Sequence, residues 1–398
     1  MHVGLLSPAW SPRSYSSGVV TYVHWLREGL RRRGHRVSIF PNLLDGPEDQ
    51  VHPVRQSPMF RARSWLASKR GNADYLVRNW GAACAGSILD VHRRDRIDVI
   101  EMEESFGWAA DVARCTSIPT VVKLHGPAFL TAGDPAPGPA RSRIEWEGAA
   151  LHGLPVLTAP ARFTLERTLS HYRLAPAIAR HVVNPLTLPD ATPLWDLDRC
   201  DRQTLLFVGR FDRLKGADVV LKAFANLLRR NPDLRLVFVG PDIGMDWESR
   251  PWVHFEELAG LLLDANARQR VEFKGKLSPP EIYALHTHAF VTLIASRFEN
   301  QSYTALEAML QGCPVVSSDG GGQAEIVSHG VTGLLAKAGS ADDLGEKIQA
   351  LLDNPEHAAV LGRNARAQVL ERHDPDRVAA QTIEVYEGAV ELAGRAAR

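Results

Sequence analysis

The stretch that decides the fold is TLLFVGRFDRLKGADVVLKAFANLLRRNPDLRLVFVG, residues 204–240. It begins with an apolar run over 204–209 and ends with another over 235–240. Such near-continuous runs are typical of strands buried on both faces. Between them, apolar residues recur at helical spacing over 217–230, so we expect an amphipathic helix there. A strand, a loop, a helix and a second strand in this order predict a parallel sheet covered by helices, which is an α/β fold.

The same order of elements opens the chain, with a strand expected over 2–6, a helix over 19–33 and a strand over 37–40. Further strands are expected at 98–100, 120–124, 156–158, 271–274, 290–294 and 314–317. Residues 131–140 are rich in Pro, Gly and Ala and predict a mobile loop, and residues 257–266 predict a single helix.

A change of composition separates the two halves. Residues 184–202 contain Pro185, Pro189 and Pro193 and show no periodicity, which indicates a linker. We therefore expect two Rossmann-like, doubly wound domains, over 1–190 and 203–375, that face each other across a cleft. Ligands in such sheets bind beyond the carboxyl ends of the strands, so functional residues are expected directly after strands.

Composition excludes several classes of protein. The 46 basic and 46 acidic side chains give a formal net charge of zero, which argues against a nucleic-acid partner. Residues 1–190 carry 23 basic and 17 acidic side chains, a net charge of +6, and residues 191–398 carry 23 and 29, a net charge of −6. The start of the chain lacks the pattern of a signal peptide, no apolar stretch is long enough to span a bilayer, and the four cysteines are widely separated. These features predict a cytoplasmic protein.

The first motif is the loop 209–216, which follows a predicted strand and opens a helix. Arg210 and Lys215 lie at the two ends of this loop. Two permanent cations at such a place form a clamp for a phosphate or a diphosphate. The alternative is a pair of solvated surface charges.

The second motif runs from Glu299 to Glu307 and contains a helix start near Ser302 or Tyr303. Free amides at a helix start can hold an anion, and carboxylates accept hydrogen bonds from hydroxyl groups. The alternative is a glutamate that stabilises the helix dipole together with a surface glutamate.

In the first half, His125 ends a predicted strand, and Ser16-Ser17-Gly18 leads into the first helix as a second possible anion site. The alternatives are a histidine satisfied by the backbone and an ordinary helix cap. Glu101, Glu103 and Glu104 follow the strand at 98–100, where they could bind an acceptor or be solvated surface charges.

Together these motifs resemble a known family. The pattern G-R-x4-K-G, then E-x7-E with A-M-x-x-G-x-P-V-V, then Gly321-Gly322-x-x-Glu325, is similar to that of the retaining family 4 glycosyltransferases, also described as glycosyl transferases group 1. The segment R-G-H-x-V at 33–37 agrees with the same family. The resemblance implies the GT-B fold, with a last helix at about 376–398 that packs back on the N-terminal domain.

The resemblance also implies roles for the residues. Arg210 and Lys215 would bind the donor diphosphate, so that neither a metal nor a cofactor is needed, and Glu299 would hold hydroxyls of the donor sugar. The remaining roles are those of the amides of Gln301, Ser302 and Tyr303 near the sugar and phosphate, Glu307 at the ribose, His125 beside the transferred sugar, and Gly18 where the first loop approaches the diphosphate. No metal site is expected at the D-x-D strings Asp196–Asp198 and Asp374–Asp376, because neither follows an apolar strand.

The expected activity is transfer of a sugar from a nucleotide-diphosphate sugar to a hydroxyl or amine acceptor, in which a hexosyl group moves with retention. One hypothesis for the acceptor is a polysaccharide, lipopolysaccharide or lipid-linked carbohydrate at the inner membrane face. There the basic segment 55–70, with Phe60 and Trp65, would contact anionic lipid. A second is a soluble small molecule such as an aminocyclitol. A different class, a non-catalytic nucleotide-sugar-binding protein, also stays open.

Overall fold

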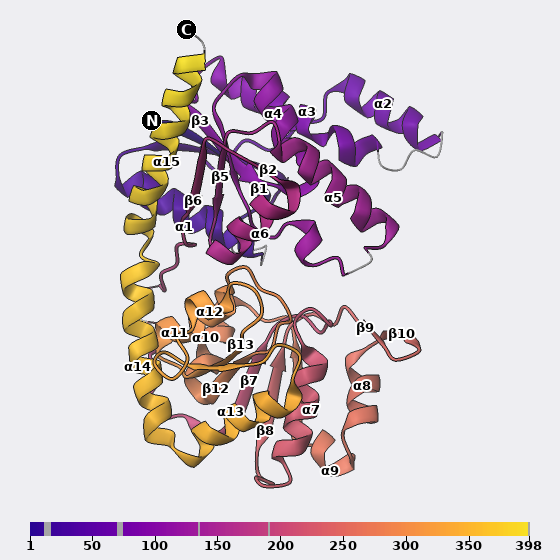
Figure 1. Cartoon of the computed structure of the whole chain (residues 1–398), viewed down its shortest axis with the longest axis vertical. Coiled ribbons are helices and arrows are strands. Elements are labelled where there is room, and N and C mark those ends of the chain that lie inside the picture. Colours follow the sequence, from indigo (N-terminus) through magenta and orange to yellow (C-terminus); the bar gives the residue numbers. More distant parts are fainter. Residues whose placement is uncertain (12–16, 70–74, 134–135, 190–191, 397–398) are drawn as a thin grey trace. The chain divides into compact units, whose positions relative to one another are not determined.

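The computed structural model describes residues 1–11, 17–69, 75–133, 136–189 and 192–396 (Figure 1). The chain divides into two compact units. The N-terminal unit comprises Met1–Leu186 and His373–Arg398, and the C-terminal unit comprises Thr187–Arg372. Each unit contains its own six-stranded sheet and its own helices, so the predicted α/β class is confirmed.

The sheet of the N-terminal unit has the strand order β2-β1-β3-β4-β5-β6, and its neighbouring strands are parallel. Its strands are β1 (His2–Trp10), β2 (Arg36–Leu44), β3 (Val99–Glu103), β4 (Thr120–Lys123), β5 (Val156–Ala159) and β6 (Ile178–His181). Its α-helices are α1 (Gly18–Arg32), α2 (Pro58–Lys69), α3 (Tyr75–His92), α4 (Trp108–Thr116), α5 (Gly138–Leu151), α6 (Arg162–Tyr172) and α15 (Pro375–Ala396). Two short 3-10 turns, η1 (Ser105–Gly107) and η2 (Ala128–Leu130), follow β3 and β4.

The sheet of the C-terminal unit has the order β11-β8-β7-β12-β13-β14, again with parallel neighbours. Its strands are β7 (Asp201–Val208), β8 (Arg235–Val239), β11 (Val271–Gly275), β12 (Ala289–Ile294), β13 (Val315–Ser318) and β14 (Leu334–Ala336), and β9 (Met245–Trp247) and β10 (Arg250–Val253) form a separate hairpin. Its helices are α7 (Ala217–Leu227), α8 (Phe255–Leu262), α9 (Ala265–Arg268), α10 (Pro279–His288), α11 (Tyr303–Gln311), α12 (Gln323–Ile326), α13 (Ala341–Asp353) and α14 (Pro355–Arg372).

The central strands are apolar because both of their faces are covered. All residues of β12 and β13 are buried, and Leu205 of β7 pairs with Leu236 of β8 on one side and Val291 of β12 on the other. Helices on both faces are what a parallel sheet requires, because its crossover connections need them. The carboxyl ends of the strands in each sheet therefore lie along one edge of that sheet.

Two local predictions from the sequence are wrong. The helix expected over 257–266 is broken into α8 and α9, because the Asp264 side chain accepts a hydrogen bond from Ala267 N at 2.8 Å and so caps a new helix. The loop expected over 131–140 ends at Gly138, where α5 begins with Pro139 in its first turn, and Pro is tolerated there. Residues 134–135 of that loop lie outside the described part of the chain.

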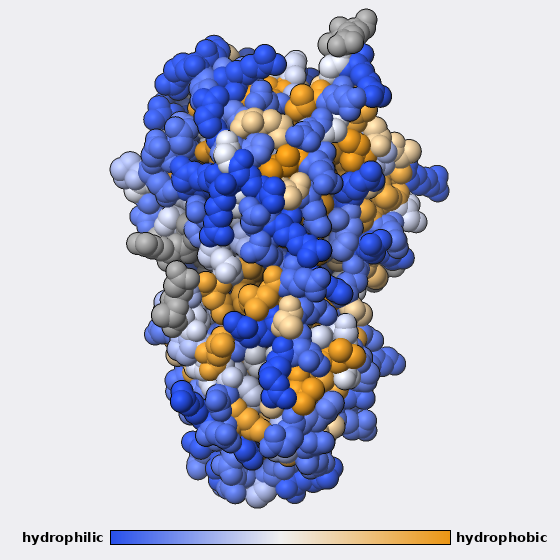
Figure 2. Space-filling view, turned by 90° about the vertical axis from the view of Figure 1, so that its left-hand side faces the viewer, coloured by the Kyte–Doolittle hydropathy of each residue, from blue (hydrophilic) through white to orange (hydrophobic). Residues whose placement is uncertain are grey.

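Helix α15 packs on α1 within the N-terminal unit. At Gly29 of α1 a Cβ atom would lie 2.1 Å from the backbone oxygen of Pro375, so the two helices approach at a position that only glycine allows. Arg33 Nη2 donates to Asp376 Oδ2 at 2.9 Å at the same end. The surface in Figure 2 is mostly hydrophilic, with apolar residues in small groups. Among the residues that the structure describes, no helix combines the length and the apolar character that crossing a bilayer demands.

Candidate active site

The loop 209–216 joins β7 to α7 at the carboxyl edge of the C-terminal sheet. Gly216 has a φ of +74°, and a Cβ atom there would lie 2.0 Å from the backbone oxygen of Ala295. Glycine is therefore required at this position, because a side chain would separate the loop after β7 from the loop after β12. Arg297 N donates to Leu214 O at 2.8 Å across the same contact.

Lys215 and Glu299 meet where these two loops touch. Lys215 Nζ donates to Glu299 Oε1, and Ser296 Oγ donates to the same oxygen at 2.8 Å. The side chain of Lys215 is 27% exposed and that of Glu299 is 13% exposed, so both still reach solvent. A cation and a carboxylate predicted from separate motifs therefore form one site.

Arg210 lies on the same loop but has a different partner. Its Nε donates to Asp212 Oδ2 at 2.7 Å, and the other oxygen of Asp212 accepts from the backbone N of Lys215 at 2.7 Å. The side chain of Arg210 is 48% exposed. Asp212 thus shapes the loop and faces one of the two predicted diphosphate cations, a role that the sequence analysis missed.

An ion pair between half-buried Arg297 and buried Asp218 connects the two loops. Arg297 Nη1 and Nη2 donate to Asp218 Oδ1 and Oδ2 at 2.8 and 2.7 Å, and Arg297 Nη1 also donates to Arg213 O at 2.6 Å. The bidentate geometry adds strength and fixes direction. The hydrogen bonds to Asp218 and the negative charge of that residue raise the pKa of Arg297, although burial opposes them. One signal in the sequence could have found Asp218, namely a carboxylate among the apolar residues that open α7.

The helix that carries Glu307 is capped by Ser302. Ser302 Oγ accepts from Ala305 N at 3.3 Å, which fixes the start of α11. The backbone N of Ser302 donates to Gln323 Oε1 at 3.4 Å, and Gln323 is fully buried and donates to Ser317 Oγ. One of the three amides predicted to face the donor thus donates to a glutamine that no motif in the sequence singled out.

Glu307 lies one turn further along α11. Burial raises the pKa of its carboxyl to about 7. Burial and the charge of Glu307 in turn raise the pKa of Tyr283 and Tyr303 above their ordinary range, so both phenols stay protonated. Because the side chain is half-buried in the structure, Glu307 is not the solvated surface glutamate of the alternative interpretation.

In the N-terminal unit, His125 follows β4 as expected. Its ring makes an edge contact with Tyr22 of α1, with ring centroids 4.8 Å apart. Burial, assisted by the positive charge of Lys123, lowers the pKa of His125 to about 3, so the imidazole is neutral at physiological pH. A neutral imidazole can donate one hydrogen bond and accept another.

Lys123 itself is a buried cation that the sequence analysis did not single out. It is 1% exposed, its Nζ donates to Val182 O and lies 5.0 Å from the centre of the Tyr22 ring. Burial lowers its pKa to about 8, whereas the negative charge of Glu101 acts in the opposite direction. Glu101 Oε1 accepts from Tyr22 Oη at 2.6 Å, so this carboxyl of β3 is hydrogen-bonded to α1.

Three glutamates were expected to follow a strand at 98–100, but that strand, β3, extends to Glu103, so only Glu104 follows it. Both interpretations of these glutamates are wrong for Glu101 and Glu104. Glu101 is 3% exposed and Glu104 is 2% exposed, so neither is a solvated surface charge nor available to an acceptor. Each is instead occupied by internal hydrogen bonds. Periodicity did not reveal this, because charged residues are mostly exposed unless they are paired.

Gly18 is exposed and begins α1. Ser17 precedes it with extended backbone, and its side chain makes no capping hydrogen bond within the described part of the chain, so an ordinary side-chain cap is not what this residue provides. Ser16 lies outside the described residues.

The two D-x-D strings form turns. Asp196 Oδ1 accepts from the backbone N of Asp198 at 2.8 Å, and Asp374 Oδ1 accepts from the backbone N of Asp376 and Arg377 at 3.0 Å each. In the described ranges, no group of three or more His, Cys, Asp or Glu side chains is placed to hold a metal ion.

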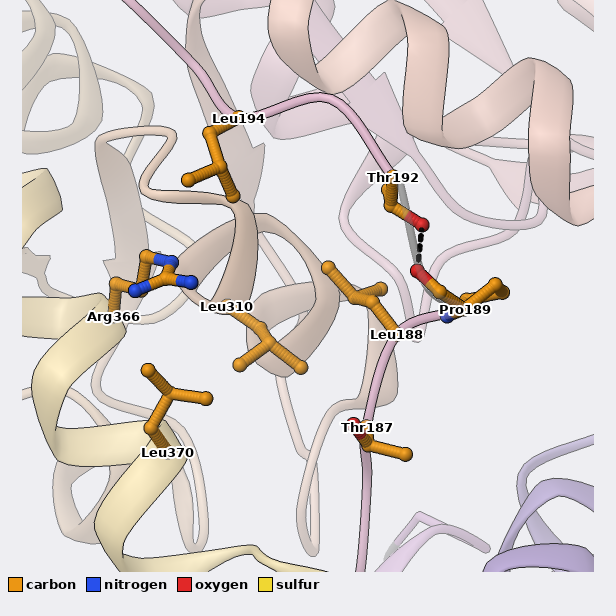
Figure 3. Close-up of a pocket in the computed structure, with 8 residues that line it drawn as sticks. All are labelled: Thr187, Leu188, Pro189, Thr192, Leu194, Leu310, Arg366 and Leu370. Atoms are coloured by element: carbon orange, nitrogen blue, oxygen red, sulfur yellow. Dashed lines mark hydrogen bonds between the residues drawn. The ribbon is translucent and has the colours of Figure 1, made fainter.

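A separate pocket of about 230 Å³ lies in the C-terminal unit (Figure 3). Its apolar wall combines Leu188 and Leu194 of the linker with Leu310 of α11 and Leu370 of α14, and Arg366 is its cation. None of the residues predicted for the donor site lines it.

Comparison with known proteins agrees with this architecture. The family model Glycosyl transferases group 1 matches residues 198–368, and Glycosyltransferase Family 4 matches residues 16–187. The chain is 30% identical to an uncharacterized glycosyltransferase of Methanocaldococcus jannaschii, over 99% of this chain and 100% of that protein. It is 29% identical to D-inositol 3-phosphate glycosyltransferase of an Arthrobacter species, over 97% of this chain and 93% of that protein.

Solved structures show the same fold. Sucrose-phosphate synthase of Thermosynechococcus elongatus superposes with a TM-score of 0.74 at 20% identity, covering 97% of this chain and 98% of that one. Anabaena HepE in complex with UDP-glucose gives a TM-score of 0.69 at 16% identity, over 98% of this chain and 100% of that one. The resemblance and the fold class inferred from the sequence are thus confirmed: this chain is a glycosyltransferase of family 4, group 1, with the GT-B fold.

Proposed function

We propose that this glycosyltransferase is a retaining, metal-independent enzyme that moves a hexosyl group from a nucleotide-diphosphate sugar to a hydroxyl or amine of its acceptor. The observation that carries the proposal is the contact between Lys215 and Glu299, with Arg210 on the same loop. A cation suits the diphosphate, and a carboxylate beside it suits the hydroxyls of the attached sugar.

Departure of the diphosphate is the step that these cations would assist. As the bond between the sugar and the phosphate breaks, negative charge develops on the phosphate oxygen, and fixed cations aimed at that charge lower the barrier. Lys215 and Arg210 would supply them, so a metal ion is not required. Glu307 would accept hydrogen bonds from the ribose, and the start of α11 at Gln301–Tyr303 would lie near the sugar and phosphate.

His125 and Gly18 of the N-terminal unit complete the proposal. The neutral His125 would hydrogen-bond the transferred sugar while it resembles an oxocarbenium ion. Gly18 would let the backbone of the first loop approach the diphosphate. For retention, the acceptor oxygen bonds to the anomeric carbon on the face that the phosphate leaves, and the acceptor proton passes to the departing phosphate oxygen.

The identity of the sugar donor is the first property to determine. Because HepE was solved with UDP-glucose, that compound heads a panel of nucleotide-diphosphate sugars, each assayed for nucleotide release in EDTA. We expect turnover of at least one donor and a loss of about 100-fold or more in Glu299→Ala. If no donor in the panel is bound or hydrolysed, the enzyme proposal fails. If donors bind but are not turned over with any acceptor, the protein is a nucleotide-sugar-binding protein.

The acceptor has two candidates, and the first is a small polar molecule. The relative from Arthrobacter is named for D-inositol 3-phosphate, a phosphorylated cyclitol, and an anionic acceptor would agree with the net charge of +6 over residues 1–190. Transfer to a panel of cyclitols and cyclitol phosphates, followed by mass spectrometry and by the anomeric coupling constant of the product, tests the acceptor and the retention together.

The second candidate is an acceptor carried by a membrane. Helix α2 has no buried residue and exposes Met59, Trp65 and Leu66 together with Arg61, Arg63 and Lys69. Apolar and basic side chains on one short helix favour contact with anionic lipid, which would make the protein peripheral to a membrane. Co-sedimentation with vesicles that contain phosphatidylglycerol tests it. Binding should disappear when Arg61, Arg63 and Lys69 are changed to Glu, and a lack of wild-type binding at low salt contradicts this candidate.

A further inference from the structure

The loop that carries His125 is held by one buried carboxylate. Glu104 follows β3 directly and is 2% exposed. Its Oε2 accepts from the backbone N of His125 at 2.8 Å, and its Oε1 accepts from the backbone N of Gly126 at 2.7 Å. A single side chain therefore fixes two consecutive peptide units, and with them the direction in which the His125 side chain leaves the backbone.

A second carboxylate holds the same loop two residues later. Glu147 of α5 is fully buried, and its Oε2 accepts from the backbone N of Ala128 at 2.8 Å. Arg143 Nε donates to Glu147 Oε1 at 2.8 Å, so this carboxylate has a cation beside it. Glu104 has no such ion pair among the described residues, and its partners are the two backbone amides.

The charged and titratable groups that face Glu104 come from four elements. They are Glu103 of β3, Glu147 and Arg143 of α5, Tyr172 of α6 and His125 itself. Burial raises the pKa of Glu104 to about 8, and the negative charges of Glu147 and Glu103 act in the same direction. The hydrogen bond from the amide of His125 opposes this shift.

The geometry needs the ionised form of Glu104. A carboxylate accepts at both oxygens, which is what two N–H groups require. A protonated carboxyl would turn one oxygen into a hydroxyl group whose hydrogen competes with the amide for the same space. Replacement by Gln has a similar consequence, because the NH₂ group would face an N–H donor.

We propose that Glu104 is a positioning residue, which in its ionised form orients His125 for the reaction through the amides of His125 and Gly126. This inference rests on the proposed function, because that proposal places His125 beside the transferred sugar. A displacement of the reacting geometry by about 1 Å can cost about 100-fold in rate. Loss of the hydrogen bonds from the amides of His125 and Gly126 to Glu104 should therefore lower kcat much more than it changes KM.

The test compares Glu104→Gln with Glu103→Gln. The control residue, Glu103, precedes Glu104 and ends β3; its carboxylate accepts from Ser105 Oγ at 2.9 Å and, among the described residues, accepts no hydrogen bond from the His125 loop. For the donor that the nucleotide-release screen selects, we expect Glu104→Gln to lower kcat about 10- to 100-fold with KM changed by no more than about twofold. Glu103→Gln should keep the maximal kcat. In the wild type, kcat should rise with pH towards about 8 as Glu104 ionises; this rise should be absent in Glu104→Gln and shifted to lower pH in Glu103→Gln.

A second readout does not depend on activity. In ¹H–¹⁵N spectra of the full chain, the amide protons of His125 and Gly126 should titrate together in the wild type and move upfield in Glu104→Gln, because hydrogen bonds to a charged acceptor are stronger. Glu104→Asp keeps the charge on a shorter side chain and should retain part of the effect.

The outcomes separate the two proposals. If the wild type turns over no nucleotide sugar, the proposed function fails. If the amide shifts of His125 and Gly126 are also unchanged in Glu104→Gln, the positioning role of Glu104 is overturned as well. If the wild type is active, the inference is overturned when Glu104→Gln keeps kcat and its pH profile. It is also overturned when kcat falls only in proportion to the folded fraction measured by urea unfolding.

Discussion

The ammonium of Lys215 and the carboxylate of Glu299, 84 residues apart in the chain, are joined by a hydrogen bond at the edge of the C-terminal sheet. Ser296 donates to the same carboxylate oxygen, so Glu299 is held from two sides. A diphosphate that binds Lys215 must compete with the Glu299 carboxylate for the N–H groups of the Lys215 ammonium. Donor binding and the orientation of Glu299 are therefore expected to change together.

The strength of this contact can be measured as a coupling energy. Because both side chains keep some contact with solvent, we expect a modest coupling of about 1 kcal/mol or less in a double-mutant cycle of Lys215→Met and Glu299→Gln followed by urea unfolding. The same cycle measured on donor binding should give a coupling of different size, because the donor replaces one partner. Identical couplings in the two measurements would contradict competition between donor and Glu299.

The ion pair of buried Asp218 with half-buried Arg297 should contribute more to stability than the pair of Lys215 and Glu299. Asp218→Asn removes a charge whose side chain is only 5% exposed and leaves Arg297 without its bidentate partner. We expect a loss of about 2–4 kcal/mol in the free energy of unfolding. We also expect a raised KM for the donor, because the loops that carry Lys215 and Glu299 lose the ion pair that connects them. The exposed pair of Glu256 and Arg268 is the matched control, and Glu256→Gln should cost less than about 0.5 kcal/mol.

The raised pKa of Glu307 predicts that donor binding depends on pH. Its raised pKa, about 7, means that acidification below neutrality protonates the carboxyl and removes its capacity to accept from two ribose hydroxyls. The affinity for the nucleoside diphosphate, measured by titration calorimetry, should therefore increase between pH 6 and pH 8. This increase should be absent in Glu307→Gln, and an affinity that rises on acidification would show that the protonated form binds.

The same raised pKa affects stability with the opposite sign. A carboxyl that holds its proton more tightly in the folded state stabilises that state at low pH, below its ordinary pKa. This contribution is lost as the pH rises through about 7. Glu307→Gln should thus gain stability relative to the wild type above pH 7, as measured by thermal unfolding across that range.

Lys123 should contribute to the stability of the folded protein. Lys123→Met removes the positive charge that opposes the burial-raised pKa of Glu101. If Glu101 is ionised, it becomes a buried charge without a compensating cation, which costs about 3–5 kcal/mol. The double variant Lys123→Met with Glu101→Gln should recover a large part of that loss in thermal unfolding. If the single variant is as stable as the wild type, Glu101 is not charged in the folded protein.

Much of the fold could be predicted from the sequence, because buried parallel strands and amphipathic helices leave plain patterns. The strands expected over 204–209 and 235–240 correspond to β7 (Asp201–Val208) and β8 (Arg235–Val239), and the helix expected over 217–230 corresponds to α7 (Ala217–Leu227). The break at Asp264 was not visible, because a cap in the middle of an apolar stretch depends on a local hydrogen bond and not on periodicity.

The site was predictable only in part, for a physical reason. Motif spacing selected Lys215 and Glu299, but it could not show that they contact one another, since the contact depends on the register of two strands. The burial of the carboxylates of Glu101 and Glu104 could not be predicted from the sequence either. Their partners come from α1 and from the loop after β4, and sequence patterns do not report contacts between distant elements.

One measurement tests the central claim most directly. It is the binding of a nucleotide-diphosphate sugar from the donor panel, in EDTA, to the wild type and to Lys215→Ala. The matched control is Lys347→Ala of α13, because Lys347 is likewise half-buried and ion-paired with a carboxylate, that of Asp343. The account predicts that the wild type and the control bind alike without metal and that Lys215→Ala binds at least about 10-fold more weakly, since it loses a charge-assisted contact to the diphosphate. Equal binding by Lys215→Ala, or wild-type binding that requires a divalent cation, would contradict it.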